Sequence, residues 1–167
     1  EACEAAEELQ LIFQYIGASR ARMQWGEMRV EANVSLRPKG SETFGTKVEL
    51  KNINSFKAVE RAILYEIERQ RQMLEEGGTI EQQTRGWDEA KGETVLQRMK
   101  ESAHDYRYFP EPDLAPLDIR ALRKTLHHKL PELPSKKRER FRKEYLLDKE
   151  AIEIFVRNAS YATFFEQ

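Results

Sequence analysis

Residues 27–37 alternate strictly between apolar and polar side chains, and this alternation constrains the fold more than any other feature of the chain. The apolar positions are Met28, Val30, Ala32, Val34 and Leu36, and the polar positions are Glu27, Arg29, Glu31, Asn33, Ser35 and Arg37. Successive side chains of a strand point to opposite faces of a sheet. The segment therefore predicts a strand with one buried face and one polar face.

A second alternating segment, residues 46–53, follows a loop rich in turn residues at 38–45. Here Val48 and Leu50 are apolar, whereas Lys47, Glu49 and Lys51 are polar. The two segments predict an antiparallel hairpin, which places their two polar rows on the same side.

The remaining patterns predict helices and two more strands. Residues 1–16 and 56–74 have helical apolar spacing, with stops at Gly17 and at Gly77 and Gly78. In the first helix we expect Ala5, Leu9, Ile12, Phe13 and Ile16 to lie in the core. Residues 80–87 and 94–100 predict strands around a turn at 88–92. The fold class is α+β, an antiparallel sheet with helices on one face.

The pattern changes after Leu114, and we place a domain boundary near Ala115. Residues 1–114 form the body, and residues 115–167 begin an all-α domain whose helices are capped by Asp118, Ser135 and Asp148. The body holds 16 Lys and Arg against 21 Asp and Glu, and the second segment 12 against 8. The basic excess at 120–143 suggests a polyanion such as nucleic acid. A solvated helix face is the alternative.

Composition narrows the classes of protein. Cys3 is the only cysteine, which excludes an internal disulfide and a cysteine zinc site. Neither a membrane-spanning run nor a signal peptide is apparent. We therefore expect a cytoplasmic protein that does not associate with a membrane. The chain starts without Met and ends inside a helical pattern, so we expect an internal fragment of a longer protein.

The polar face of the predicted hairpin is a candidate site. Carboxylates such as Glu31 and Glu49 suit a hard cation, and Arg37 and Lys51 suit phosphate groups. Lys51, Asn52, Asn54 and Ser55 also lead into a predicted helix N-terminus, which favours an anion. The alternatives are a merely solubilising sheet face and ordinary helix caps.

Residues 103–114 combine charge, aromatic rings and two prolines. Asp105, Arg107, Glu111 and Asp113 alternate with Tyr106, Tyr108 and Phe109, and Pro110 and Pro112 stiffen the segment. We expect the arm to run along the polar face, anchored by Tyr108 or Phe109. An ordered surface loop is the alternative.

Five segments in order resemble one family: RVEANVSLRPK at 29–39, FGTKVELKNINSF at 44–56, TRGWDEAKGET at 84–94, HDYRYFPEPDL at 104–114 and LPELP at 130–134. They are similar to the B subunits of bacterial and organellar aspartyl/glutamyl-tRNA amidotransferases. The resemblance covers essentially the whole chain, but the family's chains are much longer.

The resemblance implies a glutamine synthetase-like body that uses ATP and Mg²⁺ to phosphorylate the side-chain carboxylate of a glutamate or aspartate misacylated onto tRNA. Ammonia then displaces the phosphate. It further implies a glutaminase, the A subunit, that makes the ammonia, a small C subunit that wraps both, and tRNA-binding helices after the body. Whether the tRNA carries Glu, Asp or both stays open.

Family positions fall on residues of this chain. Glu49, Lys51, Asn52, Asn54 and Ser55 match the family run E-x-K-N-x-N-S, and Glu31 stands where the family often has Asp. Arg98, Asp105 and Arg107 match its late motif. The resemblance thus implies Glu31 and Glu49 as metal ligands. It also implies a catalytic set of Glu31, Glu49, Lys51, Arg98, Asp105 and Arg107. Arg37, Lys51, Asn52, Asn54 and Ser55 are the expected nucleotide-binding residues. A non-catalytic nucleic-acid-binding module built on 120–143 is the alternative function.

Overall fold

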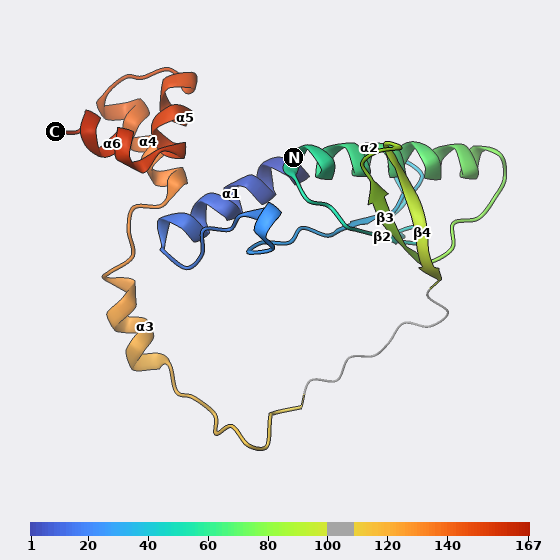
Figure 1. Cartoon of the computed structure of the whole chain (residues 1–167), viewed down its shortest axis with the longest axis horizontal. Coiled ribbons are helices and arrows are strands. Elements are labelled where there is room, and N and C mark those ends of the chain that lie inside the picture. The colour runs from blue at the N-terminus through green and yellow to red at the C-terminus, as the bar shows by residue number, and fades with distance from the viewer. Residues whose placement is uncertain (100–108) are drawn as a thin grey trace. The chain divides into compact units, whose positions relative to one another are not determined.

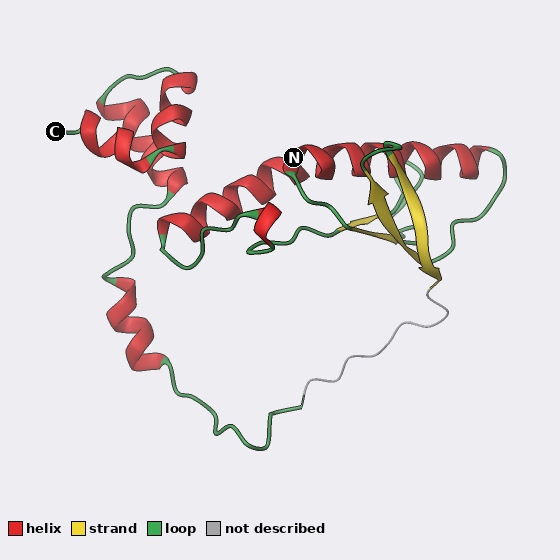
Figure 2. Cartoon of the chain, in the orientation of Figure 1, coloured by secondary structure: helices red, strands yellow, loops and turns green. Residues whose placement is uncertain are grey.

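The structure is a computed structural model of the chain and describes residues 1–99 and 109–167. Contacts divide it into two compact units, Glu1–Glu7 with Ala21–Arg107 and Glu8–Arg20 with Tyr108–Gln167. Figures 1 and 2 trace the elements along the chain. Helix α1 (Ala2–Tyr15) is shared between the units. The boundary near Ala115 stays a prediction.

In the first unit, the described residues form a four-stranded sheet in the order β1-β2-β3-β4. The strands are Ala32–Val34, Val48–Lys51, Gln83–Asp88 and Glu93–Met99. The outer pairs, β1–β2 and β3–β4, are antiparallel, but β2 and β3 are parallel. The fold class α+β is confirmed, whereas the expectation of a wholly antiparallel sheet is wrong. Helix α2 (Phe56–Glu75) is the reason, because it is a crossover that returns the chain before β3 starts.

The hairpin prediction is confirmed, although its strands are shorter than predicted. Asn33 lies opposite Glu49, and Val34 lies opposite Val48. Strand β1 covers three residues of the alternating segment at 27–37. β1 is an edge strand, so it pairs with β2 alone. Because β2 has only four residues, it offers few backbone groups for pairing, which keeps β1 short.

Helix α2 packs its apolar side on the sheet. Val48 and Leu50 of β2 are fully buried, and they form a core with Val59 and Ala62 of α2 and Trp87 of β3. The Ser55 hydroxyl caps the helix by accepting a hydrogen bond from the Ala58 backbone N–H at 3.1 Å. Burial of each large apolar side chain contributes about 1.5–3 kcal/mol to stability.

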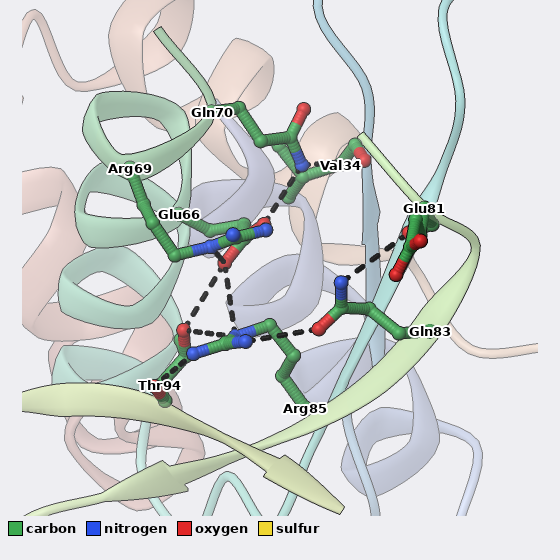
Figure 3. Close-up of polar contacts among 8 residues, drawn as sticks. All are labelled: Val34, Glu66, Arg69, Gln70, Glu81, Gln83, Arg85 and Thr94. Carbon is green, nitrogen blue, oxygen red and sulfur yellow. Dashed lines mark hydrogen bonds and ion pairs between the residues drawn. The ribbon is translucent and has the colours of Figure 1, made fainter. Parts of the chain in front are cut away.

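A buried polar cluster also joins α2 to the sheet (Figure 3). Glu66 of α2 is fully buried, and its carboxylate accepts hydrogen bonds from Arg69 at 2.7 Å, Gln70 at 2.8 Å and Thr94 of β4 at 3.1 Å. Arg85 of β3 lies 3.6 Å from the same carboxylate. Burial lowers the pKa of the Arg85 guanidinium, and the nearby Arg69 cation acts in the same direction.

The second unit is helical in its described residues. It contains α3 (Arg120–His127), α4 (Pro134–Glu144), α5 (Lys149–Arg157) and α6 (Ala159–Phe165), besides part of α1. Phe141 of α4 is fully buried at its centre, with its ring 5.3 Å from that of Tyr145 and 5.8 Å from that of Phe155. Asp148 caps α5 as predicted, its carboxylate accepting from the Ala151 N–H at 2.8 Å.

Three sequence expectations about helices are wrong. Helix α3 begins at Arg120 with Ile119 as its cap residue, so Asp118 lies one position too early to cap it. Helix α4 begins at Pro134 with Leu133 as its cap residue, so Ser135 lies inside the helix. Proline suits the first helical position because its missing N–H needs no partner there. In α1 the buried residues are Ala6 and Leu11, whereas Leu9, Phe13 and Ile16 of the expected core stripe are 37–50% exposed.

Within the described residues, no helix is both long and apolar enough to cross a membrane.

We predict that Phe141→Ala destabilises the chain by about 3–5 kcal/mol, because it leaves a cavity at the centre of the second unit. The control is Phe164→Ala, which removes a ring that is 80% exposed. Urea unfolding followed by circular dichroism measures both. Equal effects of the two substitutions would show that Phe141 does not organise this core.

We also predict that Glu66→Ala costs about 3–5 kcal/mol, because it leaves the largely buried guanidinium of Arg85, whose side chain is 14% exposed, without its compensating charge. Glu68→Ala, in the same helix, removes an exposed carboxylate that pairs with Arg71 at 2.9 Å and should cost about 1 kcal/mol or less. Unfolding free energies of the two variants test this. A Glu66 variant as stable as the Glu68 variant would contradict the prediction.

Candidate functional site

Two carboxylates and one ammonium group meet on the polar face of the sheet. The Lys51 Nζ lies 3.2 Å from the Glu31 Oε1 and 3.6 Å from the Glu49 Oε1. Glu49 also lies opposite Asn33 in the ladder, so Asn33 shares this face. The prediction that Glu31, Asn33, Glu49 and Lys51 project from one face is confirmed. We call Glu31, Glu49 and Lys51 the charged triplet, and its net charge is −1.

The parallel junction between β2 and β3 extends the polar face. Glu49 is level with Thr84, and Thr84 is level with Arg98 of β4. The Thr84 hydroxyl donates to the Glu49 Oε2 at 2.9 Å and accepts from the Arg98 Nε at 3.5 Å. Glu49 and Arg98 were expected from the sequence, whereas Thr84 was not. A strand alternation that places Thr84 and Gly86 on one face was the available signal.

Gly86 opens space on the same face. It is level with Lys51, and a Cβ placed on it would lie 2.3 Å from the Gln97 Nε2. The Gln97 side chain therefore crosses β3 at Gly86. Because the glycine has no side chain, Gln97 can extend toward the charged triplet. The register of β4 shifts between the partners of Thr84 and Arg85, which accounts for the position of Gln97.

An open hollow of about 720 Å³ lies beside the charged triplet. Its polar lining includes Arg29, Glu31, Lys51, Asn52, Asn54 and Gln97. Its volume falls in the range of small-molecule sites, about 300–1,000 Å³. The hollow thus brings Glu31 and Lys51 together with two of the asparagines singled out from the sequence.

The turn between β2 and α2 holds Asn52 in an uncommon conformation. Its φ is +60°, and its side-chain Nδ2 donates to the Trp87 backbone carbonyl at 3.1 Å. Asparagine tolerates this left-handed region better than most residues. This bond fixes the turn that places Lys51 before it and Asn54 after it. Ser55 then caps α2, whose N-terminal N–H groups favour an anion.

Of the remaining expected site residues, Arg37 is not part of this group. Arg37 donates to the Glu42 carbonyl at 3.1 Å and lies over the Phe44 ring at 4.7 Å, in the loop after β1. Arg37 does not line the hollow. Asp105 and Arg107 lie outside the described residues, as does Tyr108 of the expected arm. Phe109 is 81% exposed, so it does not anchor that arm.

The carboxylates on the polar face are few for a metal site. Across residues 1–99 and 109–167, no three His, Cys, Asp or Glu side chains gather as a metal cluster. Glu31 and Glu49 nevertheless offer hard carboxylate oxygens around one cation, the Lys51 ammonium. Mg²⁺ commonly takes one or two carboxylates and completes its shell with water and phosphate oxygens. The pair therefore fits part of a magnesium site.

The chain matches proteins of known family along its length. The profile of the GatB/GatE catalytic domain family matches residues 1–123. The B subunit of an aspartyl/glutamyl-tRNA(Asn/Gln) amidotransferase from Thermoanaerobacter sp. (strain X514) is 51% identical over 168 residues, which cover 100% of this chain and 35% of that protein. B subunits of the same name from Caldicellulosiruptor saccharolyticus and Persephonella marina are 50% and 52% identical, over 96% of this chain and 34% of theirs.

The matched family supports the resemblance on which the site residues were chosen. The chain spans about a third of the length of these relatives. With the profile matched over residues 1–123 and half of the residues identical, the chain belongs to the GatB/GatE catalytic domain family.

Proposed function

We propose that the chain is part of the B subunit of a tRNA-dependent amidotransferase. That protein would use ATP to phosphorylate the side-chain carboxylate of Glu-tRNA(Gln) or Asp-tRNA(Asn), and ammonia would then displace the phosphate to form the amide. The observation that supports this most is the charged triplet beside a polar hollow, in a chain of this family. Because the chain spans about a third of its relatives, we assign the activity to the longer protein and expect this chain alone to be inactive.

Lys51 is the proposed phosphate-binding cation. Its side chain is about one-third exposed and lines the hollow, so it can meet a ligand there. Asn54 and the N-terminal N–H groups of α2 would bind further phosphate oxygens beside it. In phosphoryl transfer the protein acts mainly by positioning and by stabilising charge, and a fixed lysine next to oriented N–H donors supplies both.

Glu31 and Glu49 are the proposed ligands of Mg²⁺. Their charges exceed that of Lys51 by one, so the charged triplet retains a net attraction for a cation. When bound, Mg²⁺ supplies charge neutralisation at the transferred phosphoryl group. Arg98 would add a second cation at the far side of Glu49, through Thr84.

The relatives are named as B subunits, which implies partner subunits. We propose that the partners are a glutaminase, the A subunit, which supplies ammonia, and the small C subunit. Misacylated tRNA is the proposed substrate.

The basic helices differ in how they can meet tRNA. Arg138 of α4 is paired with Glu8 at 2.8 Å and with Glu153 at 2.6 Å, and hydrogen bonds from Arg138 lower the pKa of Glu153. Arg140 pairs with Glu132 and Glu166. These arginines hold the second unit together. Three basic residues in or next to α3 are exposed: Arg123, Lys124 and Lys129. Among the described residues, the structure shows no ion pair for any of the three. We propose that these three contact the tRNA backbone.

We predict that Lys51→Ala in the full-length B subunit, assembled with its partners, lowers the amidation rate by about 100-fold or more, because charge stabilisation of the phosphoryl group is lost. Glu31→Gln should act in the same direction. tRNA affinity should be retained in both. Lys47→Ala is the matched control, since Lys47 is exposed on β2's N-terminal side. Wild-type ATP-dependent phosphorylation of the aminoacyl-tRNA by both site variants would remove these residues from the site.

We predict that replacing Arg123, Lys124 and Lys129 by Gln weakens tRNA binding and lowers the slope of log affinity against log salt by roughly 2. The effect should be similar for every tRNA, since backbone contacts carry no sequence information. Replacing Lys39, Lys57 and Lys91 by Gln is the charge-matched control. Affinity measured over a salt series tests this. An unchanged slope would leave α3 as a solvated helix, and loss for one tRNA alone would indicate base or shape recognition.

A further inference from the structure

A row of polar residues crosses the sheet at the level of Glu49, and its least exposed member is a threonine. The row runs from Asn33 through Glu49 and Thr84 to Arg98, one residue from each strand. Thr84 is 2% exposed, so water does not readily replace its hydrogen bonds. The resemblance assigns no role to this residue.

The direction of the hydrogen bonds follows from their chemistry. An ionised carboxylate only accepts, and a guanidinium only donates. The single proton of the Thr84 hydroxyl must therefore go to the Glu49 Oε2, at 2.9 Å, and the hydroxyl oxygen is left to accept from the Arg98 Nε at 3.5 Å. The other oxygen of Glu49, Oε1, lies on the side of Lys51. The two oxygens of Glu49 thus have different partners.

We propose that Thr84 is a positioning residue for the site. By holding the Oε2 of Glu49, it fixes the side-chain torsions of that carboxylate so that the Oε1 faces Lys51. It also couples Glu49 to the Arg98 cation, which polarises the hydroxyl and strengthens its bond to the carboxylate. This inference rests on the proposed function, because it concerns the carboxylate that we propose as a cation ligand. Mutation of a residue that orients a metal ligand in this way commonly lowers metal affinity or activity by about 10- to 100-fold.

The chain provides a matched control on the opposite face of the same sheet. Thr94 is also 2% exposed, and its hydroxyl also donates to a carboxylate, that of Glu66, at 3.1 Å. Thr94 faces α2, whereas Thr84 faces the charged triplet. Valine has the shape of threonine without the hydroxyl, so Thr84→Val and Thr94→Val each remove one buried donor. They differ in which carboxylate loses it.

The experiment uses the full-length B subunit assembled with its partners. Thr84→Val should lower kcat for amidation and raise the Mg²⁺ concentration for half-maximal activity, each by about 10- to 100-fold. Equilibrium binding of Mn²⁺, followed by its electron paramagnetic resonance signal with ATP present, should weaken in parallel. Thr84→Ser retains the hydroxyl and should stay near the wild type in all three readouts. Thr94→Val should lower the unfolding temperature but leave the Mn²⁺ affinity unchanged.

Two results would overturn the positioning role. One is a Thr84→Val variant with wild-type kcat and Mn²⁺ affinity. The other is equal weakening of Mn²⁺ binding by Thr84→Val and Thr94→Val, which would indicate general loosening of the sheet. Glu49→Gln, assayed alongside, separates this inference from the proposed function. Full activity of Glu49→Gln would refute Glu49 as a ligand, whereas an inactive Glu49→Gln with a normal Thr84→Val would refute only the inference.

Discussion

The sheet that carries the candidate site depends on a buried negative charge. Glu66 of α2 accepts hydrogen bonds from its own helix and from Thr94 of β4, and it lies next to Arg85 of β3. An unpaired carboxylate at this depth would cost several kcal/mol, so its partners are constrained to stay in place. The ion pair with Arg85 therefore fixes β3 against the helix. The opposite face of β3 holds Thr84, which completes the polar row. The same strand thus carries the contact with α2 on one face and a member of the polar row on the other.

Periodicity in the sequence predicted the parts of the fold that local physics determines. The alternation at 27–37 and 46–53 predicted the β1–β2 hairpin, and Gly77 and Gly78 predicted the end of α2. The parallel pairing of β2 with β3 could not be predicted in this way, because a strand's pattern does not state which neighbour it joins or in which direction. The burial of Glu66 could not be predicted either. An acidic residue in a charged helix is expected to be exposed, and its partners in β3 and β4 are known only from the fold.

The candidate site was predictable to the extent that its members share one hairpin. Glu31, Glu49 and Lys51 could be placed on one face from their spacing alone. Thr84 comes from a strand across the crossover, so its contact with Glu49 could not be read from a local pattern. The count of basic residues likewise overestimated the positive charge that the helices can offer to a ligand. Arg138 and Arg140 form ion pairs within the second unit. Their carboxylate partners come from segments distant in sequence, such as Glu8.

The parallel junction also has a consequence for the order of folding. β1–β2 and β3–β4 each close between neighbouring segments, whereas Glu49 and Thr84 are 35 residues apart. Contacts of larger sequence separation require more chain entropy to be lost before they form. A folding chain can therefore hold both hairpins before β2 joins β3, and at that stage Glu49 lacks its hydroxyl partner. We therefore expect the polar row to be completed when the two hairpins dock, at the last step of sheet assembly.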